Sequence, residues 1–208
     1  MDPEQPEVDY TSVEEIAAEL ECWLKQHGYN EVSCLFGCSM GGAVVAKMLA
    51  NGGIRCRYAI MDGGMTPYRL PRLLTYCIAI RDWCMVELGK HAGLRMLRSL
   101  FPEEKCSEDD LIYIRKCLRG MSAKTVWRAF YSCNNYKMPP QVEKTSCKIQ
   151  YWYGSEEKKA RKWDIEYIVR TFPQIECVEN PGIAHAEFFT RYPQRFAEQL
   201  FAFCAMDN

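Results

Sequence analysis

The sequence lacks long apolar runs and has almost no net charge. No stretch of its 208 residues approaches the roughly 20 consecutive apolar residues that a membrane-spanning helix needs. The 26 lysines and arginines nearly balance the 27 aspartates and glutamates, so no strong field would draw the chain to nucleic acid or to an anionic membrane. We therefore expect a small molecule or another protein as partner, with no nucleic acid and no membrane.

The beginning of the sequence also lacks a secretory signal. Residues 1–20 are acidic and have no basic segment followed by an apolar one, which is the pattern of a signal peptide. The 12 cysteines would suit a disulfide framework in a small secreted scaffold, but a chain of this length can build its own apolar core. We expect a cytoplasmic protein with reduced thiols that mostly fill the core.

Histidine is scarce, and clustered metal ligands are missing. The 3 histidines are His27, His91 and His185. A structural zinc site needs two closely spaced pairs of Cys or His, and the pair Cys34 and Cys38 has no second pair beside it. The sequence therefore indicates no metal site.

Apolar periodicity predicts short strands that alternate with helices. Helical spacing of apolar residues predicts helices over 12–26, 41–51 and 193–203. Short apolar runs that end in turn residues predict strands over 32–36, 57–62, 148–153 and 175–179. Strands separated by helices indicate an α/β fold with a mainly parallel sheet and flanking helices.

Residues 66–147 have helical periodicity and no convincing strand. A connection of this length is far longer than the usual 2–6 residues in α/β units. We expect a helical cap inserted into a single domain that spans 1–208. Its large apolar side chains could line an apolar pocket, although their helical spacing also suits ordinary core packing. These side chains are Trp83, Met85, Met96, Trp127, Phe130 and Tyr131.

Residues 37–41, Gly-Cys-Ser-Met-Gly, lie between a predicted strand and a predicted helix. Gly-x-Ser-x-Gly in that position is typical of a nucleophile elbow, a strained turn that needs small neighbours. The segment matches neither the Gly-x-Gly-x-x-Gly of a dinucleotide site nor the Gly-Lys-Ser/Thr of a phosphate-binding loop. Ser39 is therefore the candidate nucleophile, and a glycine-rich turn with a bystander serine is the alternative.

A serine nucleophile needs a base, and His185 is placed to supply one. It follows the last predicted strand, on a loop at the carboxyl edge of the sheet from which it could reach the elbow. His27 ends a predicted surface helix and His91 falls in the helical insertion, so we expect both to be solvated or structural. A plain surface histidine is the alternative for His185.

Several of these features together resemble an α/β-hydrolase. They are the elbow, the helical insertion after the next strand, the turn that follows Gly154, and Gly-x-x-His at 182–185 with Pro193, Phe196 and Leu200 after it. In that family the chain order is nucleophile, acid, histidine. The resemblance therefore implies Ser39, then a carboxylate, then His185.

The resemblance also suggests which carboxylate is the acid. The family's acid commonly lies three residues after a glycine that closes a strand, which implies Glu157 after Gly154. Asp62, at the tip of the strand that follows the elbow, is the second choice, and Glu156 is the third. A solvated helix start is the alternative explanation of the charged run that contains Glu156 and Glu157.

One part of the family pattern is missing before the elbow. The resemblance implies two oxyanion donors, the amide of Met40 and an amide from a loop after an earlier strand. Residues 1–38 accommodate only one helix and one strand, so we expect an N-terminally shortened fold. A truncated sequence, a natural minimal form and a lineage that has lost catalysis would each give this pattern.

The shortened fold would leave the elbow strand at an edge of the sheet. Its unpaired backbone groups could then pair with another chain, and we expect homodimerisation through this edge.

The resemblance implies a serine hydrolase that cleaves an ester, thioester or similar acyl bond through an acyl-enzyme. Ser39 would attack, His185 would transfer the proton and Glu157 would orient His185. An acyltransferase could use the same residues, and a non-catalytic binding or assembly module would keep the fold without a complete site. No metal or organic cofactor is implied.

Overall fold

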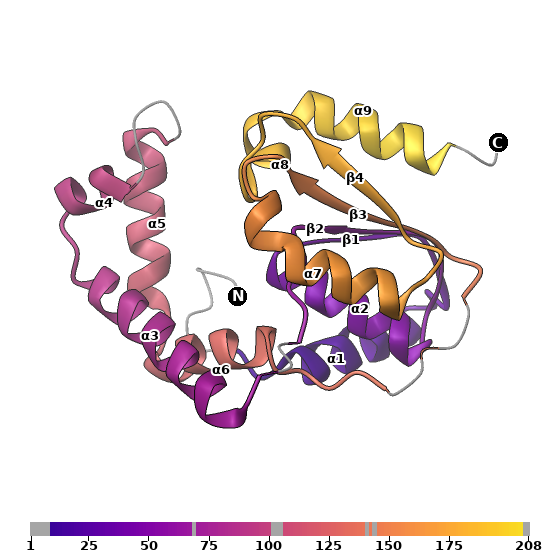
Figure 1. The fold of residues 1–208 in the computed structure, drawn as a ribbon, viewed down its shortest axis with the longest axis horizontal. Coiled ribbons are helices and arrows are strands. Elements are labelled where there is room, and N and C mark those ends of the chain that lie inside the picture. Colours follow the sequence, from indigo (N-terminus) through magenta and orange to yellow (C-terminus); the bar gives the residue numbers. More distant parts are fainter. Residues whose placement is uncertain (1–8, 68–69, 101–105, 140–141, 143–144, 206–208) are drawn as a thin grey trace. The chain divides into compact units, whose positions relative to one another are not determined.

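The computed structural model describes residues 9–67, 70–100, 106–139, 142 and 145–205. The chain divides into two compact units, one formed by Met1–Ser12 and Tyr68–Asn135 and the other by Val13–Pro67 and Tyr136–Asn208. We call them the helical unit and the sheet unit and describe each by itself (Figure 1). The longer segment of the helical unit, Tyr68–Asn135, falls within the predicted insertion over 66–147, parts of which lie outside the described residues.

Within the described residues, the sheet unit contains a four-stranded parallel sheet in the order β1-β2-β3-β4. The strands are β1 (Glu31–Cys38), β2 (Arg55–Asp62), β3 (Lys148–Gly154) and β4 (Glu176–Asn180). This arrangement confirms the predicted α/β fold with a mainly parallel sheet and places β1 at one edge of it.

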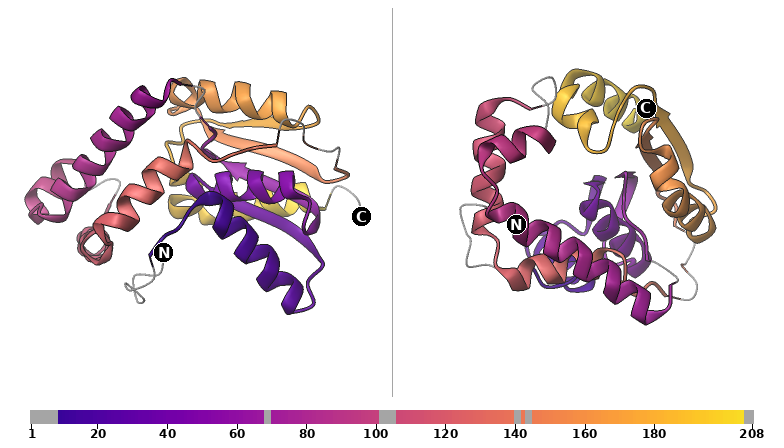
Figure 2. Two further views of the ribbon diagram at one scale, coloured as in Figure 1. Left: turned by 90° about the horizontal axis from the view of Figure 1, so that it is seen from below. Right: turned by 60° about the vertical axis from the view of Figure 1, so that its left-hand side comes forward.

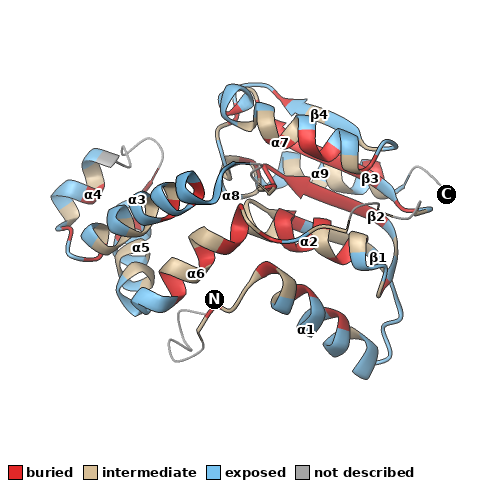
Figure 3. Cartoon of the chain, turned by 60° about the horizontal axis from the view of Figure 1, so that its bottom comes forward, coloured by how far each residue is buried: buried red, intermediate tan, exposed pale blue. Residues whose placement is uncertain are grey.

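The two central strands form the middle of the core. Every residue from Tyr58 to Asp62 in β2, and from Ile149 to Gly154 in β3, is buried, as the burial colouring of Figure 3 shows. Parallel strands covered by helices on both faces have near-continuous apolar runs, and β2 and β3 follow that pattern.

One face of the sheet is covered by α2 (Met40–Asn51) and α7 (Lys158–Thr171). Val45 and Leu49 of α2 share a buried cluster with Tyr151 of β3 and Ile168 of α7. Helix α1 (Val13–Gln26) packs on the outer side of α2, and Figure 2 shows this layering from two further directions.

The opposite face is covered by α8 (Glu187–Arg191) and α9 (Pro193–Cys204). Trp152 of β3 is fully buried there, and the rings of Phe188 and Phe196 both approach it edge-on at 5.8 Å between ring centroids. Edge-to-face packing of aromatic rings adds to the free energy gained by their burial. These contacts fasten the C-terminal helices, and the loop before them, to the sheet.

The helical unit consists of α3 (Arg72–Lys90), α4 (Leu94–Leu100), α5 (Glu108–Gly120) and α6 (Ala123–Cys133), together with the described residues before Val13. Its apolar cluster is small and contains Leu97 and Leu111. Ser107 and Asp110 form a capping box at the start of α5. Within the described ranges, no helix combines the length and apolarity needed to cross a bilayer.

Parallel strands bring the residues that follow them to one edge of the sheet. Cys38 pairs with Asp62, Asp62 pairs with Trp152, and Gly154 pairs with Asn180. The elbow after β1 and the loops after β2, β3 and β4 therefore meet at this carboxyl edge, where open α/β sheets commonly bind ligands.

Candidate active site

Ser39 lies in a tight turn between β1 and α2 and has a strained backbone, with φ 54° and ψ −115°. Positive φ is uncommon for a residue with a side chain and marks stored strain. The turn is held by the chain around it. The Ser39 amide donates to the Asp62 carbonyl at 2.8 Å, and the Ser39 carbonyl accepts from the amides of Gly42 and Met65 at 3.1 and 3.2 Å.

Two of the three glycines in this turn are required by close packing. A Cβ atom on Gly37 would lie 2.2 Å from the Gly41 carbonyl oxygen, and one on Gly42 would lie 2.5 Å from the Gly64 Cα atom. A Cβ atom on Gly41 would meet no atom within 4 Å. The need for small neighbours therefore applies to Gly37 and Gly42 but not to the second glycine of the motif.

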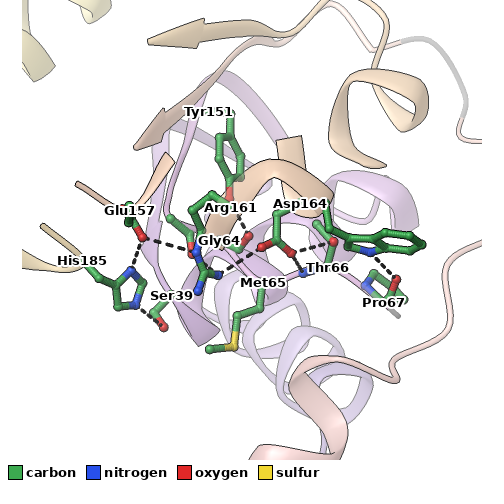
Figure 4. A network of polar contacts seen from close by, with 12 residues as sticks. Ser39, Gly64, Met65, Thr66, Pro67, Tyr151, Glu157, Arg161, Asp164 and His185 are labelled. Atoms are coloured by element: carbon green, nitrogen blue, oxygen red, sulfur yellow. Dashed lines mark hydrogen bonds and ion pairs between the residues drawn. The ribbon is translucent and has the colours of Figure 1, made fainter. Parts of the chain in front are cut away.

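Ser39, His185 and Glu157 form a hydrogen-bonded chain within the sheet unit (Figure 4). His185 Nε2 is 3.0 Å from Ser39 Oγ, and His185 Nδ1 is 2.7 Å from Glu157 Oε2. The Glu157 side chain is 7% exposed and the His185 side chain is 36% exposed. A buried acid, a histidine and a solvent-facing hydroxyl are the arrangement that activates a serine.

The other predicted candidates lie outside this chain of hydrogen bonds. His27 is exposed at the end of α1, where its ring stacks on Trp23 and contacts the Trp23 carbonyl oxygen at 2.8 Å. His91 is exposed and belongs to the helical unit. Glu156 is exposed, in contrast to its neighbour Glu157.

The acid and the histidine are positioned by loops that bind each other. The Glu156 amide donates to the Ile183 carbonyl at 3.2 Å, and the Gly182 amide donates to Ser155 Oγ at 2.9 Å. A Cβ atom on Gly154 would lie 1.9 Å from the Ile183 carbonyl oxygen. The turn after β3 and the loop after β4 therefore form one packed unit, which fixes the distance between Glu157 and His185.

Glu157 is ionised at neutral pH despite its burial. Desolvation alone would raise the pKa of this carboxyl, but its hydrogen bond to His185, the His185 charge, the Gly154 amide and the Arg161 guanidinium together hold the pKa below its ordinary value. Arg161 Nε is 3.3 Å from Glu157 Oε2. The carboxylate can therefore stabilise a protonated His185.

Arg161 also connects the acid to the loop after β2. Its Nη1 donates to Asp164 Oδ2 at 3.1 Å, and Asp164 Oδ1 accepts from the amide and the hydroxyl of Thr66 at 2.9 and 2.8 Å. Figure 4 shows this network beside the Ser39 turn. The sequence interpretation did not single out Arg161 or Asp164. Arg161 follows Glu157 by four residues, and in a predicted helix this spacing could have indicated an ion pair between them.

Asp62, the second-choice acid, is buried at the end of β2 and is 4% exposed. Among the described residues, nothing is in hydrogen-bonding position to its Oδ2 atom. Burial and then the charge of Glu157 raise the pKa of Asp62 to about 6, although His185 and Cys38 lower it. In the structure, Glu157 is therefore the carboxylate that contacts His185. Ionisation of the buried Asp62 carboxyl costs free energy.

We expect Asp62→Asn to stabilise the fold at neutral pH. Because the folded state binds the Asp62 proton more tightly than the unfolded state, ionisation destabilises the fold. This free-energy penalty is absent below the pKa that Asp62 has in the unfolded chain. It grows between about pH 4 and 6, and above that it has its full size of about 2–3 kcal/mol. Urea unfolding should show a gain over the parent at pH 7.5 that shrinks toward pH 4.5, and a gain independent of pH would contradict this.

Gly63, directly after β2, lies against the histidine and the acid. It has φ 55°, and a Cβ atom there would be 2.9 Å from His185 Nδ1 and 3.1 Å from Glu157 Oε1. The sequence gives no sign of this contact, because nothing in the local pattern shows what packs against Gly63.

We expect Gly63→Ala to lower kcat/KM for an ester substrate by about 10²-fold, because the new methyl group displaces the bonded pair by a fraction of an ångström or more. Gly52→Ala is the matched control. Gly52 has a similar φ of 66° but no atom within 4 Å of the Cβ position, so it adds backbone strain without a clash. Equal activity losses in both variants would show that strain rather than contact is responsible.

The predicted oxyanion donor is the first residue of α2. The Met40 amide is at the helix N-terminus, where amides have no acceptor within the helix and the helix dipole favours negative charge. Of the described elements, only α1 precedes β1. No second donor loop of the kind implied by the resemblance is therefore found in the described residues before β1.

Comparison by sequence finds neither a matching family model nor a matching curated protein. Comparison by structure finds many similar chains. MenH from S. aureus is 17% identical with a TM-score of 0.67, over 94% of this chain and 76% of that one. A carboxylesterase from the thaumarchaeon Nitrososphaera gargenis is 17% identical with a TM-score of 0.63, over 96% and 75%.

A third similar structure is the esterase EaEST from Exiguobacterium antarcticum. It is 14% identical with a TM-score of 0.65, over 93% of this chain and 74% of that chain. Identities this low establish the fold and not the activity. This chain has the α/β-hydrolase fold in a shortened form, as the sequence predicted.

Proposed function

We propose that this chain, which has the α/β-hydrolase fold, is a serine hydrolase that cleaves an ester or thioester bond through an acyl-enzyme. The observation that carries the proposal is the hydrogen-bonded chain from Ser39 Oγ through His185 to Glu157, with contacts of 3.0 and 2.7 Å. The strained backbone of Ser39 supports it independently, because such strain concentrates at functional sites.

In the proposed reaction, His185 Nε2 takes the proton of Ser39 as the hydroxyl oxygen attacks the acyl carbon. Glu157 keeps the Nδ1 proton in place and stabilises the imidazolium. His185 then gives the proton to the leaving alcohol or thiol. Water hydrolyses the acyl-Ser39 ester by the same steps, with His185 again as base.

Met40 is our candidate for stabilising the oxyanion. Its amide follows the nucleophile directly and belongs to the first turn of α2, so the helix dipole would add to the hydrogen bond. Loss of one donor typically costs about 10²–10³ in turnover. A site with this donor alone would therefore be a slow enzyme.

Large apolar side chains of the predicted insertion belong to the helical unit. Its aromatic side chains Tyr76, Trp127 and Tyr131 stack on one another at 5.3–6.2 Å between ring centroids, and Met85 and Met96 are exposed. Aromatic and methionine side chains suit an apolar acyl chain. The prediction that the inserted helices line the acyl pocket stays a prediction.

Two other functions use the same fold. An acyltransferase would pass the acyl group from Ser39 to an acceptor other than water, so added alcohols or thiols would compete with hydrolysis. A non-catalytic binding module would fold but turn over no ester. Cytoplasmic location and homodimerisation through the edge strand β1 also stay predictions, and sedimentation at micromolar concentration would test the second.

A series of p-nitrophenyl esters of increasing acyl length tests the proposal. We expect turnover above the buffer rate and an initial burst of p-nitrophenol close to the enzyme concentration, because deacylation limits ester hydrolysis when an acyl-enzyme accumulates. A folded protein that gives neither a burst nor turnover across the series would favour the binding module.

A further inference from the structure

A close pair of thiols lies in the sheet unit, where β2 and β3 begin and away from the carboxyl edge. Cys56 Sγ and Cys147 Sγ are 3.2 Å apart, although 91 positions separate the two residues in the chain. Cys147 is buried just before β3, and Cys56 is half-buried near the start of β2. The proposed hydrolase reaction uses neither residue.

The two thiols are not equivalent. The hydrogen bond from Cys147 lowers the pKa of Cys56, and this outweighs the effect of its burial. The same contact and then burial raise the pKa of Cys147. Because the thiolate is the reactive form of cysteine and Cys56 is the less buried of the two residues, we assign Cys56 as the nucleophile and Cys147 as the thiol that resolves it.

Cys56 is one of the residues that line a cavity of about 520 Å³. Polar side chains at its wall include Asn51, Thr145 and Ser146, and Ser146 directly precedes Cys147. A polar cavity of this size admits water and small oxidants such as a peroxide.

The pair lacks the further ligands that a metal site would need. Within the described ranges, no group of three or more His, Cys, Asp or Glu side chains is arranged to hold a metal ion. Reactive thiol pairs outside metal sites are typical of redox chemistry.

We propose that Cys56 and Cys147 form a reversible redox switch that a hydroperoxide converts into a disulfide. The Cys56 thiolate attacks the peroxide oxygen, which gives a sulfenic acid and, with hydrogen peroxide, one hydroxide that takes up a proton to become water. The Cys147 sulfur then attacks the Cys56 sulfur and displaces a second water. Overall, two thiols and one hydrogen peroxide give one disulfide and two waters, and a dithiol reductant reverses the change.

The geometry requires only a small movement. The two sulfur atoms must close from 3.2 Å to the roughly 2.05 Å of a disulfide. The resulting bond would join the starts of β2 and β3 and close a chain loop that contains most of the helical unit. Closing a long loop restricts the unfolded chain, so oxidation should stabilise the fold.

Cys34 offers a comparison within the same sheet. It interacts with Cys204 on the opposite face, but burial and then Cys204 raise the pKa of Cys34 to about 12. That thiol stays protonated at neutral pH, so a mild oxidant should reach the Cys56–Cys147 pair first.

The test is oxidation of the full chain with about one equivalent of hydrogen peroxide at pH 7.5, followed by alkylation in denaturant. The parent has 12 cysteines, and two fewer thiols should be alkylated after oxidation. Peptide mapping without reductant should find Cys56 linked to Cys147, and dithiothreitol should restore the full count. The oxidised parent should also melt at least about 5 °C higher than the reduced form.

Cys56→Ser should keep every remaining thiol alkylatable, whereas Cys147→Ser should stop at the Cys56 sulfenic acid, with one thiol fewer alkylated and no disulfide. Neither variant should show a rise in melting temperature. Cys177→Ser, which removes an exposed thiol on β4, should oxidise like the parent. Linkage between other cysteines, or no loss of thiols in the parent, would overturn the proposal. The Cys56–Cys147 linkage is measured in the parent, so the test still holds if a variant fails to fold. None of the outcomes depends on hydrolase activity.

Discussion

Replacing Ser39 by alanine should lower ester turnover by about 10⁴–10⁶-fold while the fold is retained. The Oγ atom lies 3.0 Å from His185 Nε2, so its removal leaves the base with no nucleophile. The backbone strain at φ 54° is common to serine and alanine, and α2 begins after this residue with its own packing. Stability should therefore change little.

The measurement is kcat/KM for the preferred ester, with the melting temperature of each variant. Ser33→Ala serves as control, since Ser33 is an exposed serine on β1, the strand that precedes Ser39, and it should match the parent. If Ser39→Ala kept more than about a tenth of the parental rate, hydrolysis would not proceed through this hydroxyl.

Changing Glu157 to glutamine should lower kcat by about 10³–10⁴-fold and leave KM nearly unchanged. Glutamine has almost the same shape, but it cannot balance the charge of a protonated His185, and its amide nitrogen can hold the wrong tautomer of the ring. The effect therefore belongs to the transition state. Arg161, now 3.3 Å from the Glu157 carboxylate, would lose this ion pair and keep the one with Asp164.

The neighbouring residue provides a matched control for this change. Glu156→Gln removes the same charge one position earlier from an exposed side chain, and its activity should stay within about threefold of the parent. Asp62→Asn separates the two candidate acids. If it lost as much activity as expected for Glu157→Gln, while Glu157→Gln stayed active, Asp62 would be the acid.

The sheet and the position of the elbow could be predicted from the sequence because each depends on a short local pattern. The apolar runs end at Gly37, Gly63 and Gly154, and the observed strands end at or next to these residues. Parallel pairing then requires the loops after the strands to share one edge. His185 could be predicted for the same reason, since it follows β4 directly in the chain.

The choice of acid depends on contacts that no local pattern contains. Glu157 and Asp62 both follow strands at the carboxyl edge, and only the packing of the Gly154 turn on Ile183 brings Glu157 to His185. Gly63 is a similar case, because the atoms that exclude a side chain there come from β3 and β4 loops far along the chain.

The end of the insertion shows the limit of periodicity. Residues after Asn135 belong to the sheet unit, where the Tyr136 hydroxyl donates to the Met65 carbonyl at 3.1 Å and the Lys137 amide donates to Glu14 Oε1 at 2.8 Å. The described residues of this returning segment form no strand before β3. Its assignment rests on tertiary contacts, which helical periodicity does not contain, and the limit of the insertion at 147 stays a prediction.

The proximity of Cys56 and Cys147 likewise follows from strand register. The β2 and β3 pairing begins with Tyr58 opposite Lys148, which brings the residues just before that pair together. Cysteine spacing in the sequence, with 91 positions between the two, gives no sign of it.

Active-site labelling with a fluorophosphonate tests the central claim most directly. The reagent modifies a serine only when a base and an oxyanion site activate it. Intact mass of the parent should show one adduct, peptide mapping should place it on Ser39, and Ser39→Ala and His185→Ala should stay unlabelled. A folded parent that stays unlabelled, or carries the adduct on another residue, would contradict the account.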